Sequence, residues 1–399
     1  MAPATWSVVH PRSSSVPRRP GTPRGPQGGR RLLVISASMG AGHDTVAAEL
    51  VRRARERGDT AQSVDVLALL PYGLGTILRC FYRGSVRHFP WAYAALYRLF
   101  LRPGAGRRPS GTPLARLAGD RLRQLAARTG ADVVVPVFHL GAQLTGHLRD
   151  RGLLPVPSVV LVIDFELHRQ WLHPGNDHCL CLTEEAAREV RGSTGTPAGT
   201  CGPVVAPEFS ADHVPGAAQW RETFDRLGPG RPAVLLSAGA WGVGSHLDAT
   251  VRLLADHGYL PVVLCGDNRR LRRTLSGTPG VLALGWVTDM PGLLHAARAL
   301  IDNAAGQTAV QALAAGLPVV GHRPIPGHGA DGVRRMAALG VSEVAEDRTA
   351  LLEALARLTA PGRDRRRRIA AGRALFTGNA DALTLVTDLA DAARAGVRR

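Results

Sequence analysis

A histidine and two glycines stand directly after the first apolar run of the chain. The run 32–35 is typical of a buried strand, Gly40 and Gly42 follow it, and residues 44–57 have the pattern of a helix. A strand, a glycine turn and a helix N-terminus present N–H groups and a positive helix end to an anion. His43 adds a proton acceptor at the same point, so the motif predicts an anion site beside a base, as group transfer requires.

Two other interpretations of this motif stay open. Asp65 ends the next expected strand and would bind a ribose if the turn held a dinucleotide, although the third glycine of that fingerprint is missing. A nicotinamide-dependent oxidoreductase is therefore the rival enzyme class. The simplest alternative is a tight turn with a solvent-facing histidine at position 43.

A second glycine loop lies between an expected strand and an expected helix in the other half of the chain. It contains Gly239, Gly242 and Gly244 within residues 237–246. Glycines let a backbone approach a phosphate closely, although flexible loops of this composition are common. Two such loops at matching places in two halves favour a phosphate-binding role.

A third turn opens the helix that carries Gln311. Its residues Gly306, Gln307 and Thr308 follow an expected strand, so free N–H groups and the Thr308 hydroxyl predict a diphosphate site. Upstream, the peptide around Trp286 and Val287 is placed to bind the edge of a base. Asp289 is interpreted as the cap of the helix that follows it.

The loop from Asp164 to His178 is unusually rich in histidine and aspartate. It includes His168, Trp171 and His173, but their spacing fits no standard zinc pattern, so we interpret it as a polar loop that lines a cleft. A metal site is the minority interpretation. His139, just after another expected strand, joins this loop in the prediction.

The segment from Tyr72 to Arg102 interleaves aromatic residues, Trp91 among them, with arginines. This composition suits a membrane interface, where rings lie at headgroup depth and arginines contact phosphates. A helical pair packed on the domain with some aromatics buried is an equal alternative. Nucleic-acid binding remains a background interpretation, since the sequence carries no binding fingerprint for it.

The elements expected to position these residues alternate along the chain. We expect strands at 32–36, 62–66, 132–136, 158–163, 178–182, 233–237, 260–265, 281–284, 299–302 and 318–321, and helices at 44–57, 113–129, 140–150, 184–192, 246–257, 290–297, 307–315 and 331–339. This alternation predicts an α/β fold with two Rossmann-like, doubly wound domains that face each other across a cleft.

The expected domain organisation has four parts. Residues 1–30 are a disordered basic tail, 31–202 a first Rossmann-like domain with an aromatic insert at 71–109, 203–231 a linker, and 232–399 a second Rossmann-like domain with closing helices.

Composition narrows the class of protein. The chain of 399 residues is 45% hydrophobic, which suffices for about two domains, and it has no apolar run of the ~20 residues that a membrane span needs. The net charge of +17 comes from arginine alone and favours an anionic partner. Five scattered cysteines suggest no disulfide framework, so a reducing cytoplasm is the simplest setting.

Taken together, these residues resemble the monogalactosyldiacylglycerol synthase family of GT-B glycosyltransferases, which is related to the lipid II-forming N-acetylglucosaminyltransferase. The residues that carry the resemblance are 40–43, 133–139, Asp164, His168, Trp171, His173, Asp177, Gly285, Trp286, Asp289, Met290, Gly306, Thr308 and 312–318.

The resemblance implies an inverting hexosyltransferase with no resident metal or cofactor, in which His43 is the base and Asp164 or His168 orients it or the acceptor. The donor is a nucleotide sugar, UDP-linked, bound by the second half. Its expected contacts are Gly239, Gly242, Gly244, Trp286, Val287, Gly306, Gln307, Thr308, Gln311 and His328. The acceptor is a lipid such as diacylglycerol, with Gly40, Gly42, His139, Trp171 and Trp91 as expected contacts. A peripheral position on the cytoplasmic, inner face of the cell membrane follows.

Five positions depart from the family pattern. Gln311 stands where the family has the glutamate that accepts from both ribose hydroxyls, and His328-Gly329 stands for its glutamine-glutamate. Gly332 replaces an asparagine and Ala305 a glycine. Because these changes cluster around the donor, a catalytically degenerate GT-B protein that binds lipid or nucleotide is the third hypothesis.

Overall fold

The amino-terminal lobe is built on six parallel strands. The computed structural model describes residues 29–89, 91, 95, 97–101 and 111–397. The strands are β1 (Arg31–Ser36), β2 (Thr60–Asp65), β3 (Val133–Pro136), β4 (Val159–Leu161), β5 (His178–Cys181) and β6 (Ala198–Thr200). They form two sheets in the orders β2-β1-β3 and β4-β5-β6, joined by a bridge between Val134 and Ser158.

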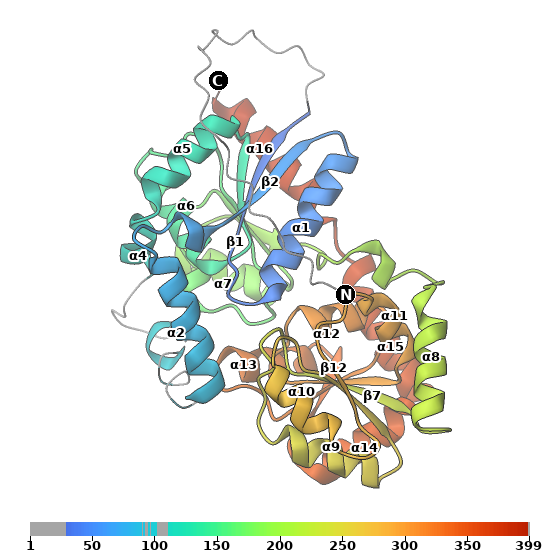
Figure 1. Cartoon of the computed structure of the whole chain (residues 1–399). Helices are drawn as coiled ribbons and strands as arrows, with labels where there is room; N and C mark the ends of the chain where they lie inside the picture. The colour runs from blue at the N-terminus through green and yellow to red at the C-terminus, as the bar shows by residue number, and fades with distance from the viewer. Residues whose placement is uncertain (1–28, 90, 92–94, 96, 102–110, 398–399) are drawn as a thin grey trace.

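Helices cover this lobe, and one segment projects from it toward the second lobe (Figure 1). The helices are α1 (Ala41–Glu56), α2 (Leu74–His88), α4 (Thr112–Arg116), α5 (Gly119–Thr129), α6 (His139–Asp150) and α7 (Glu184–Thr194), with short turns η1 (Val66–Leu69), η2 (Tyr97–Leu101), η3 (Arg169–Trp171) and η4 (Pro207–Phe209). The strand run 32–36 is buried because both faces of a parallel sheet are covered by helices.

The carboxy-terminal lobe repeats the arrangement. Its six parallel strands, in the order β12-β11-β10-β7-β8-β9, are β7 (Ala233–Ser237), β8 (Leu260–Leu264), β9 (Leu282–Leu284), β10 (Ala299–Asp302), β11 (Val319–His322) and β12 (Ser342–Ala345). Its helices are α8 (Gly216–Leu227), α9 (Leu247–Asp256), α10 (Arg269–Ser276), α11 (Met290–Ala296), α12 (Gln307–Ala314), α13 (His328–Ala338), α14 (Arg348–Thr359) and α15 (Arg363–Thr377). The expected α/β fold with two doubly wound lobes is confirmed.

The last helix, α16 (Ala382–Val397), returns to the amino-terminal lobe and packs beside α1 and against β3 and β4 (Figure 1). Leu383 and Val386 join the core that contains Leu50 of α1. Arg53 of α1 donates hydrogen bonds to buried Glu49 and to Asp381, which precedes α16. The closing helices therefore divide between the lobes instead of all covering the second one, so the chain crosses between them twice.

The order of the strands in each sheet indicates where ligands can bind. In the first lobe β2 and β3 lie on opposite sides of β1, and in the second β8 and β10 lie on opposite sides of β7. Ligands of such sheets bind at the carboxyl ends of the strands where the order reverses. Those ends face each other across the space between the lobes.

Several expectations remain without a test. The disordered tail at 1–30 lies almost wholly outside the described residues, as do parts of the 71–109 insert. The proposed linker at 203–231 contains η4 and α8, and Phe209 and Phe224 pack into the core of the second lobe. In the part of the chain that the structure describes, no helix combines the length and the apolar character needed to cross a bilayer.

Candidate active site

A cavity of about 310 Å³ lies between the two lobes. The turn after β1, residues 163–164 beyond β4 and the segments that follow β7, β8, β9, β10 and β11 all contribute to its wall. Twelve of the predicted site residues line it: Gly40, Gly42, His43, Asp164, Gly239, Trp286, Val287, Gly306, Gln307, Thr308, Gln311 and His328. Residues from both halves of the sequence therefore meet in one space.

His43 lies in the first turn of α1, not ahead of the helix as expected. The helix begins at Ala41 because Gly40, with φ +147°, takes the non-helical turn before it. The Nδ1 atom of His43 is 2.8 Å from the carbonyl oxygen of Val137, which only accepts hydrogen bonds. Nδ1 therefore carries the proton and Nε2 keeps its lone pair, as a general base requires.

The carbonyl of Val137, at the end of β3, takes the orienting role that was predicted for Asp164 or His168. The Asp164 carboxylate accepts a hydrogen bond from Trp171 Nε1 at 3.2 Å. His168 is buried, and its Nδ1 has no hydrogen-bond partner among the described residues. Because β3 pairs with β1, it delivers a backbone carbonyl to His43 Nδ1, and the orientation of the acceptor by Asp164 or His168 stays a prediction.

Three further imidazoles surround this end of the cavity. Burial, with His43 and His328 nearby, lowers the pKa of His139 to about 3. Burial also lowers the pKa of His168 well below its usual range, and it lowers that of His328, against the opposing effect of Asp164. These side chains are neutral at pH 7 and add no positive charge beside His43.

The N-terminus of α12 contributes the part of the wall that comes from the second lobe and lies next to Gly42. Gly306 caps this helix without a side-chain hydrogen bond, so the first N–H groups of the helix are available to a ligand. Asp302, at the end of β10, shapes the preceding turn by accepting from the N–H groups of Ala304 (3.0 Å) and Ala305 (2.5 Å). The arrangement can hold a diphosphate and carry its charge.

Gln307 also connects the lobes. Its Nε2 donates to the carbonyl of Val204 at 2.9 Å, and a Cβ added at Gly42 would lie only 3.3 Å from the Gln307 Cβ. Because Nε2 is engaged by Val204, the predicted contact of Gln307 with the nucleotide sugar falls to its backbone N–H and its side-chain oxygen. Gln311, one turn further along α12, is 9% exposed and offers a neutral amide to the cavity.

Two departures from the family pattern compensate each other. Ala305 has φ +51°, a left-handed conformation that favours glycine, and a Cβ at Gly332 would lie 2.9 Å from the Ala305 Cβ. A methyl at 305 therefore requires a glycine at 332.

We expect this coupling to be measurable by urea unfolding. Ala305→Gly should cost little or stabilise, by up to roughly 1 kcal/mol, because it relieves the left-handed conformation. Gly332→Asn alone should destabilise by about 1–3 kcal/mol through overpacking, and the double variant should recover most of that loss. Additivity of the two changes within about 0.5 kcal/mol would contradict the coupling.

One end of the glycine loop after β7 lines the cavity, and the other end packs against the loop after β8. Gly239, with φ +65°, lines the cavity. Gly242 packs against the loop after β8, since a Cβ there would lie 2.4 Å from the Asn268 Cβ and the Cys265 oxygen. Gly242 and Gly244 are thus not in the wall of the cavity that holds His43, and they line a neighbouring one.

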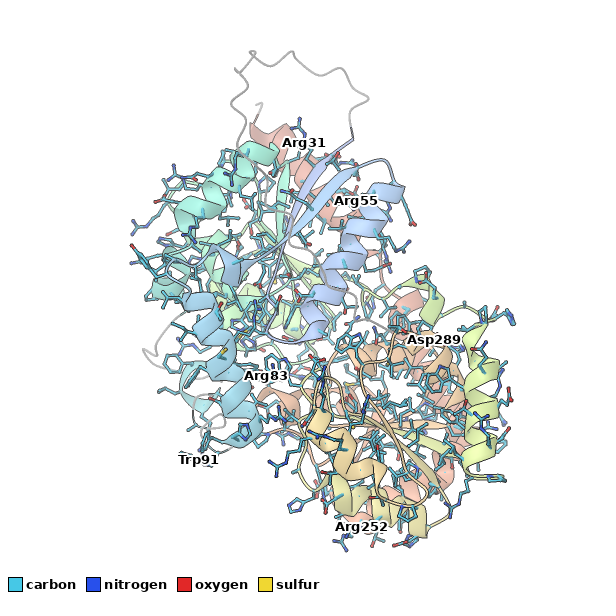
Figure 2. The ribbon with its side chains drawn as sticks, in the orientation of Figure 1. Arg31, Arg55, Arg83, Trp91, Arg252 and Asp289 are labelled. Atoms are coloured by element: carbon cyan, nitrogen blue, oxygen red, sulfur yellow. The ribbon has the colours of Figure 1, made fainter. Side chains whose placement is uncertain are left out.

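The predicted acceptor residues are dispersed. Trp171 is 1% exposed in the core of the first lobe, and His139 lies behind His43 without lining the cavity. Trp91 is 72% exposed on the insert and points away from the second lobe (Figure 2). Of these five residues, only Gly40 and Gly42 reach the cavity.

Tyr82 and Asp302 are among the lining residues that were not predicted as part of the site. Tyr82 of α2 makes an edge-on contact with Trp241 of the glycine loop, with ring centroids 5.4 Å apart. Its aromatic neighbours in the insert suggested a membrane role, and no local signal distinguished it from them. Asp302 was visible as the residue before the third turn, but its hydrogen bonds depend on the turn conformation.

The residues on which the dinucleotide and metal interpretations depended are engaged or arranged differently in the structure. Both oxygens of Asp65 are occupied, by Leu67 N–H at 2.8 Å and by Arg79 Nη2 at 2.7 Å, so this carboxylate is not free for a ribose. Asp289 caps α11 by accepting from Gly292 N–H at 2.9 Å, as predicted. Within the described ranges, no three His, Cys, Asp or Glu side chains are arranged to hold a metal ion.

Comparisons with known proteins agree with this site. Residues 43–205 match the model of the family described as monogalactosyldiacylglycerol (MGDG) synthase. A processive diacylglycerol beta-glucosyltransferase of Staphylococcus carnosus is 23% identical over 348 residues, which cover 83% of this chain and 85% of the relative.

Solved structures share the fold. Acinetobacter baumannii MurG superposes with a TM-score of 0.55 at 14% identity, covering 91% of this chain and 99% of MurG. Os79 from O. sativa, solved in complex with UDP, gives a TM-score of 0.59 at 13% identity, covering 90% and 99%. These likenesses confirm the resemblance stated from the sequence and give no support to the oxidoreductase alternative.

Proposed function

Because this chain is a GT-B hexosyltransferase that resembles the monogalactosyldiacylglycerol synthases, we propose that it moves a hexose from UDP to a hydroxyl of a diacylglycerol-type lipid. One observation carries the proposal. His43, with Nε2 free to accept a proton, lines the same interlobe cavity as the N-terminus of α12. A base and an anion site in one cavity are what transfer from a nucleoside diphosphate sugar needs.

The proposed step is a single displacement. The acceptor hydroxyl gives its proton to His43 Nε2 while its oxygen forms a bond to the anomeric carbon. The bond from that carbon to the diphosphate oxygen breaks, and UDP leaves as an anion, so the configuration inverts. The N–H groups at Gly306 to Thr308 stabilise the departing charge, and for this reason we assign no resident metal or cofactor to the reaction.

The lipid acceptor and a peripheral position on the inner face of the membrane belong to the same proposal. Large apolar side chains stand exposed on and beside α2: Tyr72 (95%), Ile77 (60%), Phe81 (57%), Phe89 (55%), Trp91 (72%) and Leu99 (53%). An exposed apolar group of this size marks an interaction surface, and the arginines among them suit anionic headgroups. Tyr82 and Tyr97 of the same segment contact the second lobe instead.

A second candidate, a GT-B protein that binds nucleotide without turnover, is favoured by one feature. Gly329 supplies no carboxylate where the family pattern places one, and a Cβ there would lie 3.1 Å from the Asn303 oxygen, so a side chain would require its neighbours to shift by a few tenths of an ångström. The sugar end of the cavity then depends on His328, Asp164 and His43.

The test uses the purified full chain with UDP-glucose, UDP-galactose and UDP-N-acetylglucosamine, each offered with diacylglycerol in anionic vesicles. We expect mass spectrometry to detect a glycosyl-diacylglycerol from at least one donor, in EDTA as well as without it. Binding of UDP with no glycolipid from any donor would overturn the transfer and favour the second candidate.

A further inference from the structure

A second cavity, of about 450 Å³, lies on the other side of the glycine loop. Gly239 and Ala240 line the first cavity, whereas residues 242–246 line the second, so the loop forms a wall between them. The end of α2 closes the second cavity from the first lobe, and α10 and the loop after β11 close it from the other. Both lobes therefore contribute to it.

The charge of this cavity is not balanced. Its wall includes three arginines and two histidines, Arg87, Arg270, Arg323, His88 and His246, but a single carboxylate, Asp248. Arg87 donates to the Asn268 amide oxygen at 2.7 Å, and Arg323 donates to the His246 carbonyl at 3.2 Å. Both partners are neutral, and none of the three arginines forms an ion pair with a described residue.

Backbone groups add to the positive potential. Helix α9 begins at this cavity, and its cap, His246, makes no side-chain hydrogen bond to the first turn. The first N–H groups of α9 thus add the positive end of a helix to the guanidinium groups. His246 (φ +53°) and Arg323 (φ +49°) are both left-handed and are held together by their hydrogen bond. Strained residues of this kind are frequent at ligand sites.

We propose that this cavity binds a phosphate group of a second ligand, separate from the donor diphosphate. Arginine and helix N–H groups are the donors that recognise phosphate, and a phosphate would neutralise the excess charge. Arg87 and His88 come from one lobe and Arg270 and Arg323 from the other, so an occupied site holds the lobes together. The phosphate is that of a lipid headgroup or of a soluble phosphate ester, since the exposed Phe89 follows His88 directly at the edge of the cavity.

The test measures binding to the full chain in saturating UDP, which keeps the first cavity filled. Calorimetry with inorganic phosphate and glycerol 3-phosphate covers soluble sources. Co-sedimentation with phosphatidylcholine vesicles, with and without phosphatidylglycerol, covers headgroups. We expect at least one source to bind, and Arg270→Gln combined with Arg323→Gln to weaken that binding by about tenfold or more.

Two controls keep the result specific. Arg252→Gln makes the same type of charge change on α9, at the end of the lobe remote from the crevice (Figure 2). We expect this variant to bind the probes as tightly as the wild type does, unlike the Arg270 and Arg323 variants. Arg270 is exposed and forms no hydrogen bond or ion pair with a described residue, so Arg270→Gln alone tests the site with little risk to folding. Displacement of every probe by UDP, or equal weakening by the Arg252 and Arg270 single variants, would overturn the proposal.

Discussion

His43→Ala is expected to lower kcat by about 10²- to 10⁴-fold, the contribution usual for a positioned general base, and to leave the Kd for UDP within about threefold. The imidazole is fixed by the Val137 carbonyl and presents Nε2 toward the cavity, whereas the N–H groups assigned to the diphosphate lie on α12. Loss of the base therefore removes a transition-state interaction without removing a donor contact. Steady-state kinetics of glycolipid formation, together with calorimetry of UDP binding, measure the two quantities separately.

His257→Ala supplies the matched control for this result. His257 is exposed, and its Nδ1 is 2.7 Å from the Leu253 carbonyl, so it makes the same type of hydrogen bond far from the cavity. We expect no change in kcat from this variant. If His43→Ala weakened UDP binding as much as turnover, or left both unchanged, His43 would not be the base.

The strongest sequence patterns predicted the elements well. Buried runs such as 32–36 and 233–237 became strands because a parallel sheet covered on both faces needs continuous apolar residues. Helices α8 and α10 were missed for the opposite reason. Only Ala217 and Phe224 of α8, and only Leu275 of α10, are buried, so each helix has only a narrow apolar stripe among polar and charged residues.

The sequence indicated which turns line the cavity, but not which atoms the side chains of these turns contact. The carboxyl ends of parallel strands meet at one edge of each sheet, which is why turns as distant as 40–43 and 306–308 line one cavity. The partner of His43 is a backbone carbonyl supplied by strand pairing, and no residue type reports such an atom. The return of α16 to the first lobe depends on tertiary packing in the same way.

The insert shows how one segment serves two surfaces. Tyr97 is buried, and its hydroxyl donates to Asp331 of α13 at 2.9 Å, while Trp91 and Leu99 of the same segment are exposed. Composition alone gave the membrane and packed interpretations equal support. The packed interpretation is confirmed for Tyr97, whereas the exposed side chains of the segment leave the membrane interpretation a prediction.

Asp302 is the residue on which the shape of the diphosphate turn depends. It is 2% exposed, and its carboxylate accepts from two N–H groups, those of Ala304 and Ala305, immediately before the cap of α12. Burial raises the pKa of Asp302, and the same N–H groups act in the opposite direction. Removal of the carboxylate leaves two buried donors without partners at the point where the phosphates are expected to bind.

Asp302→Ala should therefore destabilise the protein by about 2–4 kcal/mol and raise the Kd for UDP by about tenfold or more. Asp302→Asn keeps one acceptor oxygen and should fall between this variant and the wild type. Urea unfolding and calorimetry with UDP measure the two effects, and Asp256→Ala, at an exposed position near the end of α9, is the control that should change neither. Wild-type UDP affinity in a folded Asp302→Ala protein would show that the turn after β10 does not hold the diphosphate.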